Sequence, residues 1–223
     1  VVEHYLGEIS KITGREYHCF SYYGAEDAEN IIILMGSATE AAREAIDHLT
    51  SEGKKVGMIS VHLYRPFSVK HLFAAVPKTV KKIAVLDRTK EPGAEGEPLY
   101  LDVKSAFYDQ ENRPVIVGGR YGLGSSDITP AKIISVYNNL ELPEPKNHFT
   151  VGIVDDVTFT SLPAVEEMAL GGKSIYEAKF FGLGADGTVG ANKNSVKIIG
   201  DNTNKHCQAY FSYDSKKSGG FTC

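Results

Sequence analysis

Short apolar runs alternate with amphipathic stretches between residues 30 and 140 of this chain. Four runs are dominated by apolar and β-branched residues, as buried strands are, and they occupy 31–35, 56–61, 83–86 and 115–117. The stretches between them repeat apolar residues every three or four positions, which predicts helices. Strands this apolar are typically buried on both faces, so the alternation predicts an α/β domain, a mostly parallel sheet with helices on both faces.

Polar residues and glycine mark the ends of several predicted helices. Ser37, followed three residues later by Glu40, predicts a capping box, and Gly53 predicts the exit of the same helix. Ser68 is expected to cap the next helix. Thr129 followed by Pro130 predicts a capped helix with proline at its first position. Its apolar stripe is Ile133, Ile134, Tyr137 and Leu140.

A polar segment with two prolines, 141–147, separates this α/β pattern from a different one. We therefore predict a first domain over residues 1–146 and a second over residues 147–223. The second is expected to be an incomplete, β-rich α/β domain with a β-rich stretch at 149–159, a turn at 170–173 and strands at 178–181 and 209–213. At about 75 residues it buries a modest fraction of its surface, so it is expected to be marginal or to depend on the first domain.

Composition describes an ordinary globular protein, with 42% hydrophobic and 23% charged residues. A net charge of -4 gives no broad electrostatic reason to bind nucleic acid. No run approaches the roughly 20 apolar residues of a membrane span, and the first residues lack the features of a signal peptide, so no membrane partner and a cytoplasmic location are expected. Because the chain starts without Met and stops without a terminating signal, it is expected to be cut from something longer.

Residue types that carry catalysis or bind metals form no recognisable site pattern. The three cysteines and seven histidines lack the spacing of a disulfide framework or of a zinc or iron–sulfur site, so we expect reduced structural thiols and no metal site. Without a nucleophile elbow or a Walker loop, no catalytic residue is assigned. Asp155–Asp156 is expected to be a solvated turn or strand edge, and Arg65-Pro66-Phe67 a loop with a packed phenylalanine.

The segment 182–193 holds four glycines in its first nine residues and is the strongest candidate for binding. Glycines let backbone N–H groups approach a phosphate, but a lone Gly-x-Gly-x-x-Gly is weak evidence for a dinucleotide site. We expect residues 188–191 to delay the following helix, and the trailing lysines suit a phosphate better than a ribose. A tight interdomain connection is the alternative. The second glycine cluster, 118–127, is expected to be a structural turn.

Three motifs together resemble the pyruvate:ferredoxin (or flavodoxin) oxidoreductases. They are the glycine cluster at 118–127, the segment 180–194 and the segment 213–220. Residues 1–146 resemble that family's second domain, which is similar to the C-terminal domain of transketolases, and the remainder resembles the opening of its third, gamma-type domain. The resemblance implies an enzyme that oxidatively decarboxylates pyruvate with thiamine diphosphate, Mg²⁺, iron–sulfur clusters and coenzyme A, in anaerobic metabolism and electron transport.

The cofactor machinery cannot be placed on this chain, since the family's thiamine diphosphate and cluster sites need other domains. What the resemblance implies here is part of a coenzyme A site. The expected contacts are Gly187, Val189, Asn192, Lys193, Lys216 and Lys217. It also implies as partners the remaining domains, ferredoxin or flavodoxin through those domains, and a second copy in a homodimer.

Three hypotheses follow. The first is a non-catalytic piece of such an oxidoreductase that supplies scaffold and part of a coenzyme A site. The second is a structural interdomain or dimerisation module without a ligand. The third is a self-contained transketolase-like or dinucleotide-binding enzyme.

Overall fold

The computed structural model describes residues 1–223 except 112, 124–125, 168–174, 184–185 and 212–223. It forms two compact units, Val1–Leu170 and Gly171–Cys223. The described helices are α1 (Val2–Thr13), α2 (Ala38–Ser51), α3 (Val69–Ala75), α4 (Pro98–Ala106), α5 (Pro130–Glu141) and α6 (Thr188–Asn202). The described strands are β1 (Phe20–Gly24), β2 (Asn30–Leu34), β3 (Val56–Val61), β4 (Lys82–Asp87), β5 (Val115–Tyr121) and β6 (Phe149–Val151).

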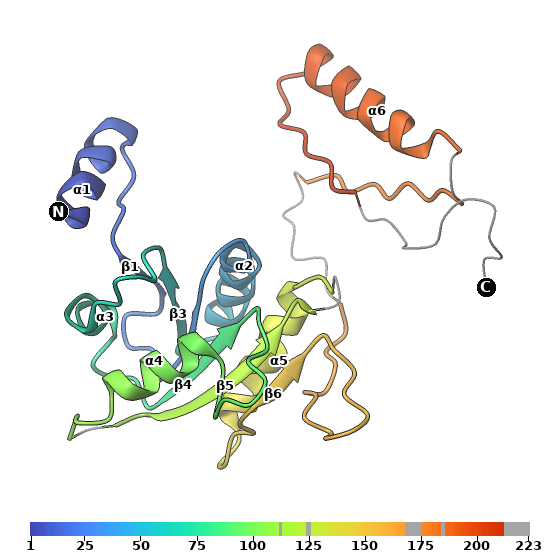
Figure 1. The fold of residues 1–223 in the computed structure, drawn as a ribbon. Coiled ribbons are helices and arrows are strands. Elements are labelled where there is room, and N and C mark those ends of the chain that lie inside the picture. Colours follow the sequence, from blue (N-terminus) through green and yellow to red (C-terminus); the bar gives the residue numbers. More distant parts are fainter. Residues whose placement is uncertain (112, 124–125, 168–174, 184–185, 212–223) are drawn as a thin grey trace. The chain divides into compact units, whose positions relative to one another are not determined.

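The strands of the first unit form one sheet in the order β1-β3-β2-β4-β5-β6 (Figure 1). All neighbouring pairs are parallel except the edge pair β1 and β3, which is antiparallel. After the edge strand β1, the chain passes through β2 in the middle of the sheet, then to β3 on one side of it and to β4, β5 and β6 on the other. The predicted mostly parallel α/β sheet is confirmed.

Alternate residues of the central strands supply two separate cores, one on each face of the sheet. Ile32 of β2 lies opposite Met58 of β3 and packs with α2 and α5, whereas its neighbours Ile31 and Ile33 pack with α3 and α4. These isoleucines are fully buried. Successive side chains of a strand point to opposite faces, so a strand that is apolar throughout needs helices on both sides. The sequence pattern and the layers agree for this reason.

Helix starts agree with the sequence only in part. The Thr129 hydroxyl accepts the N–H of Lys132 at 3.4 Å, and Pro130 opens α5, as predicted. The predicted capping box is wrong, because the Ser37 side chain makes no cap hydrogen bond and its backbone is already helical. A capping side chain needs an extended backbone at the cap residue. Gly53 does take the left-handed conformation expected after a helix, with φ of 83°.

The glycine pair Gly118–Gly119 lies inside β5 and does not form the predicted turn. A Cβ on Gly118 would lie 2.7 Å from the Tyr100 ring, and one on Gly119 would overlap the ring of Phe149. These glycines leave room for two buried aromatic rings against the sheet. The turn begins only at Gly122, whose φ is 65°.

Strand β6 extends this sheet, so residues just beyond the predicted linker pack with the first unit. Phe149 pairs with Gly119, and Thr150 forms an isolated bridge with Ser161. The loop between them is held by the Asp155 carboxylate, which accepts the backbone N–H groups of Val157, Thr158 and Thr160. The predicted solvated turn at Asp155–Asp156 is confirmed. The domain boundary at 146–147 stays a prediction. The division at Leu170 separates two compact units of the structure and is a different boundary.

The N-terminal segment contains two elements that the sequence did not reveal, α1 and β1. Helix α1 has no buried residue and ends at Gly14 in the left-handed conformation. The other helices were predicted because amphipathic stretches alternate with apolar strand runs. The exposed apolar side chains of α1 are not part of such an alternation, so the sequence pattern did not predict this helix. In the second unit, the predicted strand at 178–181 is wrong, since these residues form no strand. Of the predicted strand at 209–213, residues 209–211 form none, and residues 212–213 lie outside the described residues, as does the predicted turn at 170–173.

Candidate functional site

The glycine segment leads directly into α6, the one helix described in the second unit. Gly187 is its N-cap, with φ of 82°, and the helix begins at Thr188. The predicted delay over residues 188–191 is therefore wrong. A left-handed glycine can turn the chain into a helix within one residue, because it pays no Cβ penalty.

A carboxylate of the chain itself occupies the first backbone donor of this helix and one donor in the segment before it. Asp186 accepts the N–H of Leu183 at 3.0 Å, the N–H of Thr188 at 3.0 Å and the Thr188 hydroxyl at 2.6 Å. Hydrogen bonds from Thr188, and then from Leu183, lower the pKa of Asp186 below its usual range. An anion approaching these donors must displace or avoid this carboxylate.

Other residues of α6 were predicted from the sequence to contact coenzyme A. Val189 and Asn192 are half-buried, whereas Lys193 is exposed and its Nζ lies 5.6 Å from the centre of the Phe211 ring. The Oδ1 atom of Asn192 is buried and has no hydrogen-bond partner among the described residues. Gly187, Val189, Asn192 and Lys193 thus share the first turns of one helix. Lys216 and Lys217 lie outside the described residues.

The first unit holds a cluster of buried charges that sequence reasoning missed. Asp87 ends β4 and accepts the N–H of Leu99 at 3.0 Å and that of Tyr100 at 3.1 Å. Glu97 lies 3.7 Å from the Nε of Arg120, measured from its Oε1. Burial raises the pKa of Asp87, against the lowering effect of the two N–H groups, and the nearby Glu97 adds to the rise.

These charges hold secondary structure together. Both oxygens of Asp87 satisfy donors in the first turn of α4, whose first residue, Pro98, has none. The cap comes from a residue more than ten positions earlier, so no local cap motif announces it. Asp87 directly after a strand was the only signal available in the sequence.

The predicted loop at Arg65-Pro66-Phe67 is confirmed. Phe67 packs edge to face on Phe20, with ring centres 5.5 Å apart, and Arg65 forms an ion pair with Asp102 at 2.7 Å. Tyr64 donates to the same carboxylate at 2.8 Å. Burial first, and then this hydrogen bond, raises the pKa of Tyr64 to about 12.

The described residues contain no group of three or more His, Cys, Asp and Glu side chains that could hold a metal ion. Cys19 is buried, and burial, followed by the neighbouring Glu3, raises the pKa of its thiol to about 11. A thiol with so high a pKa is a poor nucleophile and metal ligand. Over the same described stretches, none of the helices is long and apolar enough to cross a bilayer.

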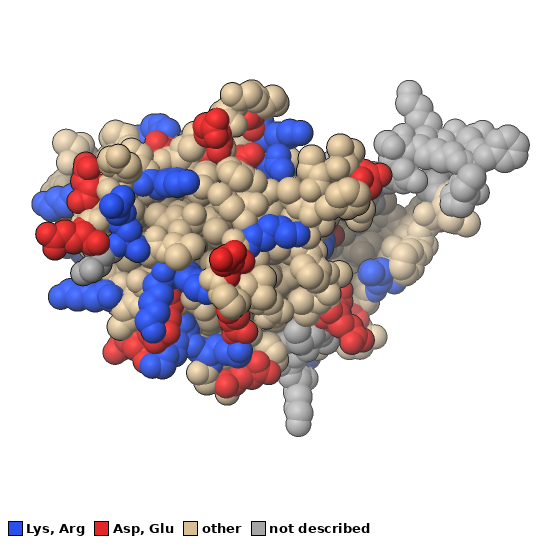
Figure 2. All heavy atoms as spheres, turned by 90° about the horizontal axis from the view of Figure 1, so that it is seen from below, with Lys and Arg blue, Asp and Glu red and all other residues tan. Residues whose placement is uncertain are grey.

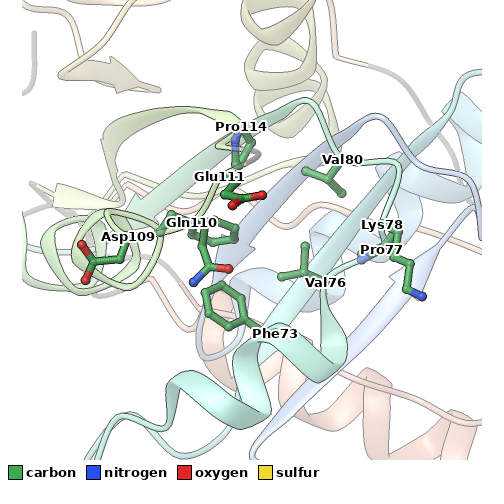
Figure 3. A pocket seen from close by; sticks show the side chains of 10 residues that line it. Phe73, Val76, Pro77, Lys78, Val80, Asp109, Gln110, Glu111 and Pro114 are labelled. Atoms are coloured by element: carbon green, nitrogen blue, oxygen red, sulfur yellow. The ribbon is translucent and has the colours of Figure 1, made fainter.

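One surface hollow of about 510 Å³ lies beside the starts of β4 and β5 (Figure 3). Phe73, Val76 and Val80 provide apolar walls, and Asp109 and Glu111 provide carboxylates. Ligands of open α/β sheets bind beyond the carboxyl ends of the strands, and this hollow lies at the opposite edge. On the face shown in Figure 2, basic and acidic side chains are interspersed, so charge does not single out a docking region there.

Alignments to known proteins include some over the whole chain. The family model for pyruvate:ferredoxin oxidoreductase core domain II matches residues 28–133. The chain is 60% identical over 223 residues to a pyruvate-flavodoxin oxidoreductase of Enterobacter agglomerans. It is 53% identical over 222 residues to a pyruvate:ferredoxin oxidoreductase of Moorella thermoacetica. Each alignment includes 100% of this chain and 19% of the relative.

A solved structure of a 2-oxoglutarate:ferredoxin oxidoreductase from Magnetococcus marinus is 24% identical, with a TM-score of 0.43, and the match covers 59% of this chain and 21% of that one. This chain spans about a fifth of the length of its curated relatives. The core-domain match and the identity over the full chain agree with the family that the three sequence motifs resemble. Over its whole length the chain is similar to one segment, about a fifth, of pyruvate:ferredoxin and pyruvate-flavodoxin oxidoreductases, and residues 28–133 match the model of their core domain II.

Proposed function

We propose that this chain is a non-catalytic part of an oxidoreductase that converts pyruvate and coenzyme A to acetyl-coenzyme A and CO₂ and reduces ferredoxin or flavodoxin. The observation that carries the proposal is the identity of 60% and 53% over the whole chain to relatives with those names. The buried α/β sheet of the first unit suits a scaffold. Its buried charges are engaged in capping and ion pairing.

The proposal assigns thiamine diphosphate, Mg²⁺ and the iron–sulfur clusters to parts of the enzyme outside this chain. The resemblance places these groups in other domains, and the described residues hold no group of three or more His, Cys, Asp and Glu side chains. The remaining domains, a ferredoxin or flavodoxin partner bound through them, a homodimer and a cytoplasmic location belong to the same proposal. It also includes a domain boundary near residue 147.

The coenzyme A contact is proposed at Gly187, Val189, Asn192, Lys193, Lys216 and Lys217. Three features of α6 support it: the positive end of the helix dipole, the exposed ammonium of Lys193 and the unpartnered Oδ1 of Asn192. Because Asp186 holds the N–H of Thr188, the geometry favours a phosphate bound by lysine side chains over one cradled by the backbone.

The test is isothermal titration of coenzyme A into the whole oxidoreductase carrying Lys193→Ala. Loss of a charge-assisted contact to phosphate is expected to raise Kd by about 10-fold. Lys205→Ala, an exposed lysine beyond the end of α6, is the matched control and should leave Kd unchanged. An equal Kd for the Lys193→Ala and unmutated enzymes would remove Lys193 from the site.

A structural interdomain or dimerisation role is the second candidate, and Asp186 is the observation that favours it. At the start of α6 its own carboxylate already accepts the N–H of Thr188, so this donor needs no external anion. If neither Lys193→Ala nor Asn192→Ala changes the Kd for coenzyme A, while either shifts the subunit equilibrium in sedimentation, the structural role is the correct one.

A further inference from the structure

Helix α1 presents three distinct faces. The first faces its own unit through Glu3, Leu6 and Ser10, which are half-buried. The second is charged and contains the ion pair of Glu8 and Lys11, whose Oε1 and Nζ lie 2.7 Å apart. The third is apolar and consists of Val2, Tyr5, Ile9 and Ile12, all of them exposed. We call this set the α1 stripe.

The first face fixes the direction of the helix. The Glu3 carboxylate accepts the backbone N–H of Cys19 at 2.7 Å, and the Ser10 hydroxyl accepts that of Tyr17 at 3.0 Å. Leu6 packs against the core cluster that also contains Phe20. Two hydrogen bonds and one apolar contact, all on the first face, hold α1 against its own unit. The α1 stripe therefore has a defined orientation, and it lies next to the first face.

The α1 stripe has the spacing of a helix-packing seam. Its members follow one another at intervals of three, four and three residues, which places them on one side of the helix. Tyr5 is 61% exposed and Ile12 is 85% exposed. Neighbouring helices bury side chains at this spacing by packing ridges into grooves.

We propose that the α1 stripe docks against an apolar helix face supplied by the same polypeptide outside these 223 residues. This rests on the proposed function, in which the chain is part of a longer oxidoreductase. The relatives align with α1 and with all of the chain, yet the chain covers only 19% of their length, so more than four-fifths of each relative is available as the occupant.

A second copy of α1 is a poorer occupant. Twelve residues extend about 18 Å, and helices this short are marginal without tertiary packing. Four side chains per copy do not reach the roughly 1,000 Å² of a stable interface, so two α1 stripes do not by themselves hold the proposed homodimer together. A segment of the same polypeptide avoids this requirement, because its effective concentration at α1 is high.

Thiol labelling of the whole oxidoreductase tests the proposal. Ile9→Cys places a thiol in the α1 stripe, and Lys11→Cys, on the charged face, is the matched control. Peptide mass spectrometry distinguishes the two introduced thiols from Cys19. The labelling rate of each thiol is divided by the rate of the same thiol in the urea-unfolded enzyme. We expect the Ile9→Cys thiol to react about 30-fold more slowly than the Lys11→Cys thiol, since only local opening exposes a docked side chain. Equal normalised rates overturn the proposal.

A photoreactive benzoylphenylalanine in place of Tyr5 identifies the occupant. A cross-link within one subunit to a peptide outside these 223 residues supports the proposal. A product of twice the subunit mass, joined α1 to α1, overturns it in favour of a second copy. Neither readout depends on coenzyme A. A failed coenzyme A titration therefore does not contradict docking of the α1 stripe, and a failed labelling test does not contradict the proposed coenzyme A site.

Discussion

Removal of the Asp87 carboxylate should uncap α4 and measurably weaken the first unit. The two oxygens of Asp87 accept the N–H groups of Leu99 and Tyr100, one each, at 3.0 and 3.1 Å. Both donors are buried with the carboxylate, which is 6% exposed. A hydrogen bond to a charged group contributes about 1.5–3 kcal/mol, so Asp87→Ala should lower the free energy of unfolding by about 3–5 kcal/mol.

Asp87→Asn removes the charge of the side chain but keeps an oxygen that can cap α4. Its Oδ1 can still accept one N–H, but its amide group faces the other donor, so we expect a cost of about 1–2 kcal/mol. The assay is urea unfolding of the 223-residue chain followed by far-UV circular dichroism, with hydrogen exchange of the peptide that contains α4. Asp109→Ala, an exposed carboxylate beyond the same helix, is the control and should stay within about 0.5 kcal/mol.

The pH dependence of Asp87 has a defined sign. Burial raises the pKa of the folded Asp87 carboxyl above its usual value, so the folded chain keeps this proton after the unfolded chain has released it. Its contribution to stability therefore falls as pH rises from about 4 to the raised folded pKa. The stability difference between the unmutated chain and Asp87→Asn should shrink over that range. A difference that grows with pH, or an Asp87→Ala variant as stable as the unmutated chain, would refute the reasoning.

Three further substitutions test other parts of the first unit. Gly119→Ala forces a Cβ into the ring of Phe149 and should cost about 1–3 kcal/mol in urea unfolding, whereas Gly7→Ala, with open space around it, should cost nothing. Tyr137→Phe removes a fully buried hydroxyl that donates to a carbonyl of β3 at 2.8 Å, and we expect a loss of about 1–2 kcal/mol by the same assay. Glu3→Gln should speed hydrogen exchange of α1 about 5-fold at neutral pH. The hydrogen bonds from Cys19 lower the pKa of Glu3 to about 2, so this stabilisation holds above about pH 4.5 and is lost as pH falls toward 2.

The central sheet could be predicted from the sequence because its buried strands are continuous apolar runs. Ile31 to Leu34 are apolar without interruption, and the structure buries all four between two helical layers. The α5 cap was equally visible, since Thr129 bonds to a donor three residues away. The α4 cap was not visible, because Asp87 reaches donors twelve and thirteen residues further on. Gly118 and Gly119 were misinterpreted for a related reason: the aromatic rings that exclude a Cβ come from α4 and β6.

The second unit shows where local reasoning fails and which measurement now matters. Residues 178–181 are apolar except for Lys179, which predicted a strand, yet Phe180 and Phe181 are exposed and the segment pairs with no described strand. An apolar run becomes a strand only when it finds a partner. The glycine loop was interpreted as a backbone cradle, but Asp186 holds its first donors. Because Asp186 holds the N–H of Thr188, the proposed coenzyme A contact depends more on side chains of α6 than on this donor, and substitution of Lys193 is the sharper test of a coenzyme A site against an interdomain connection.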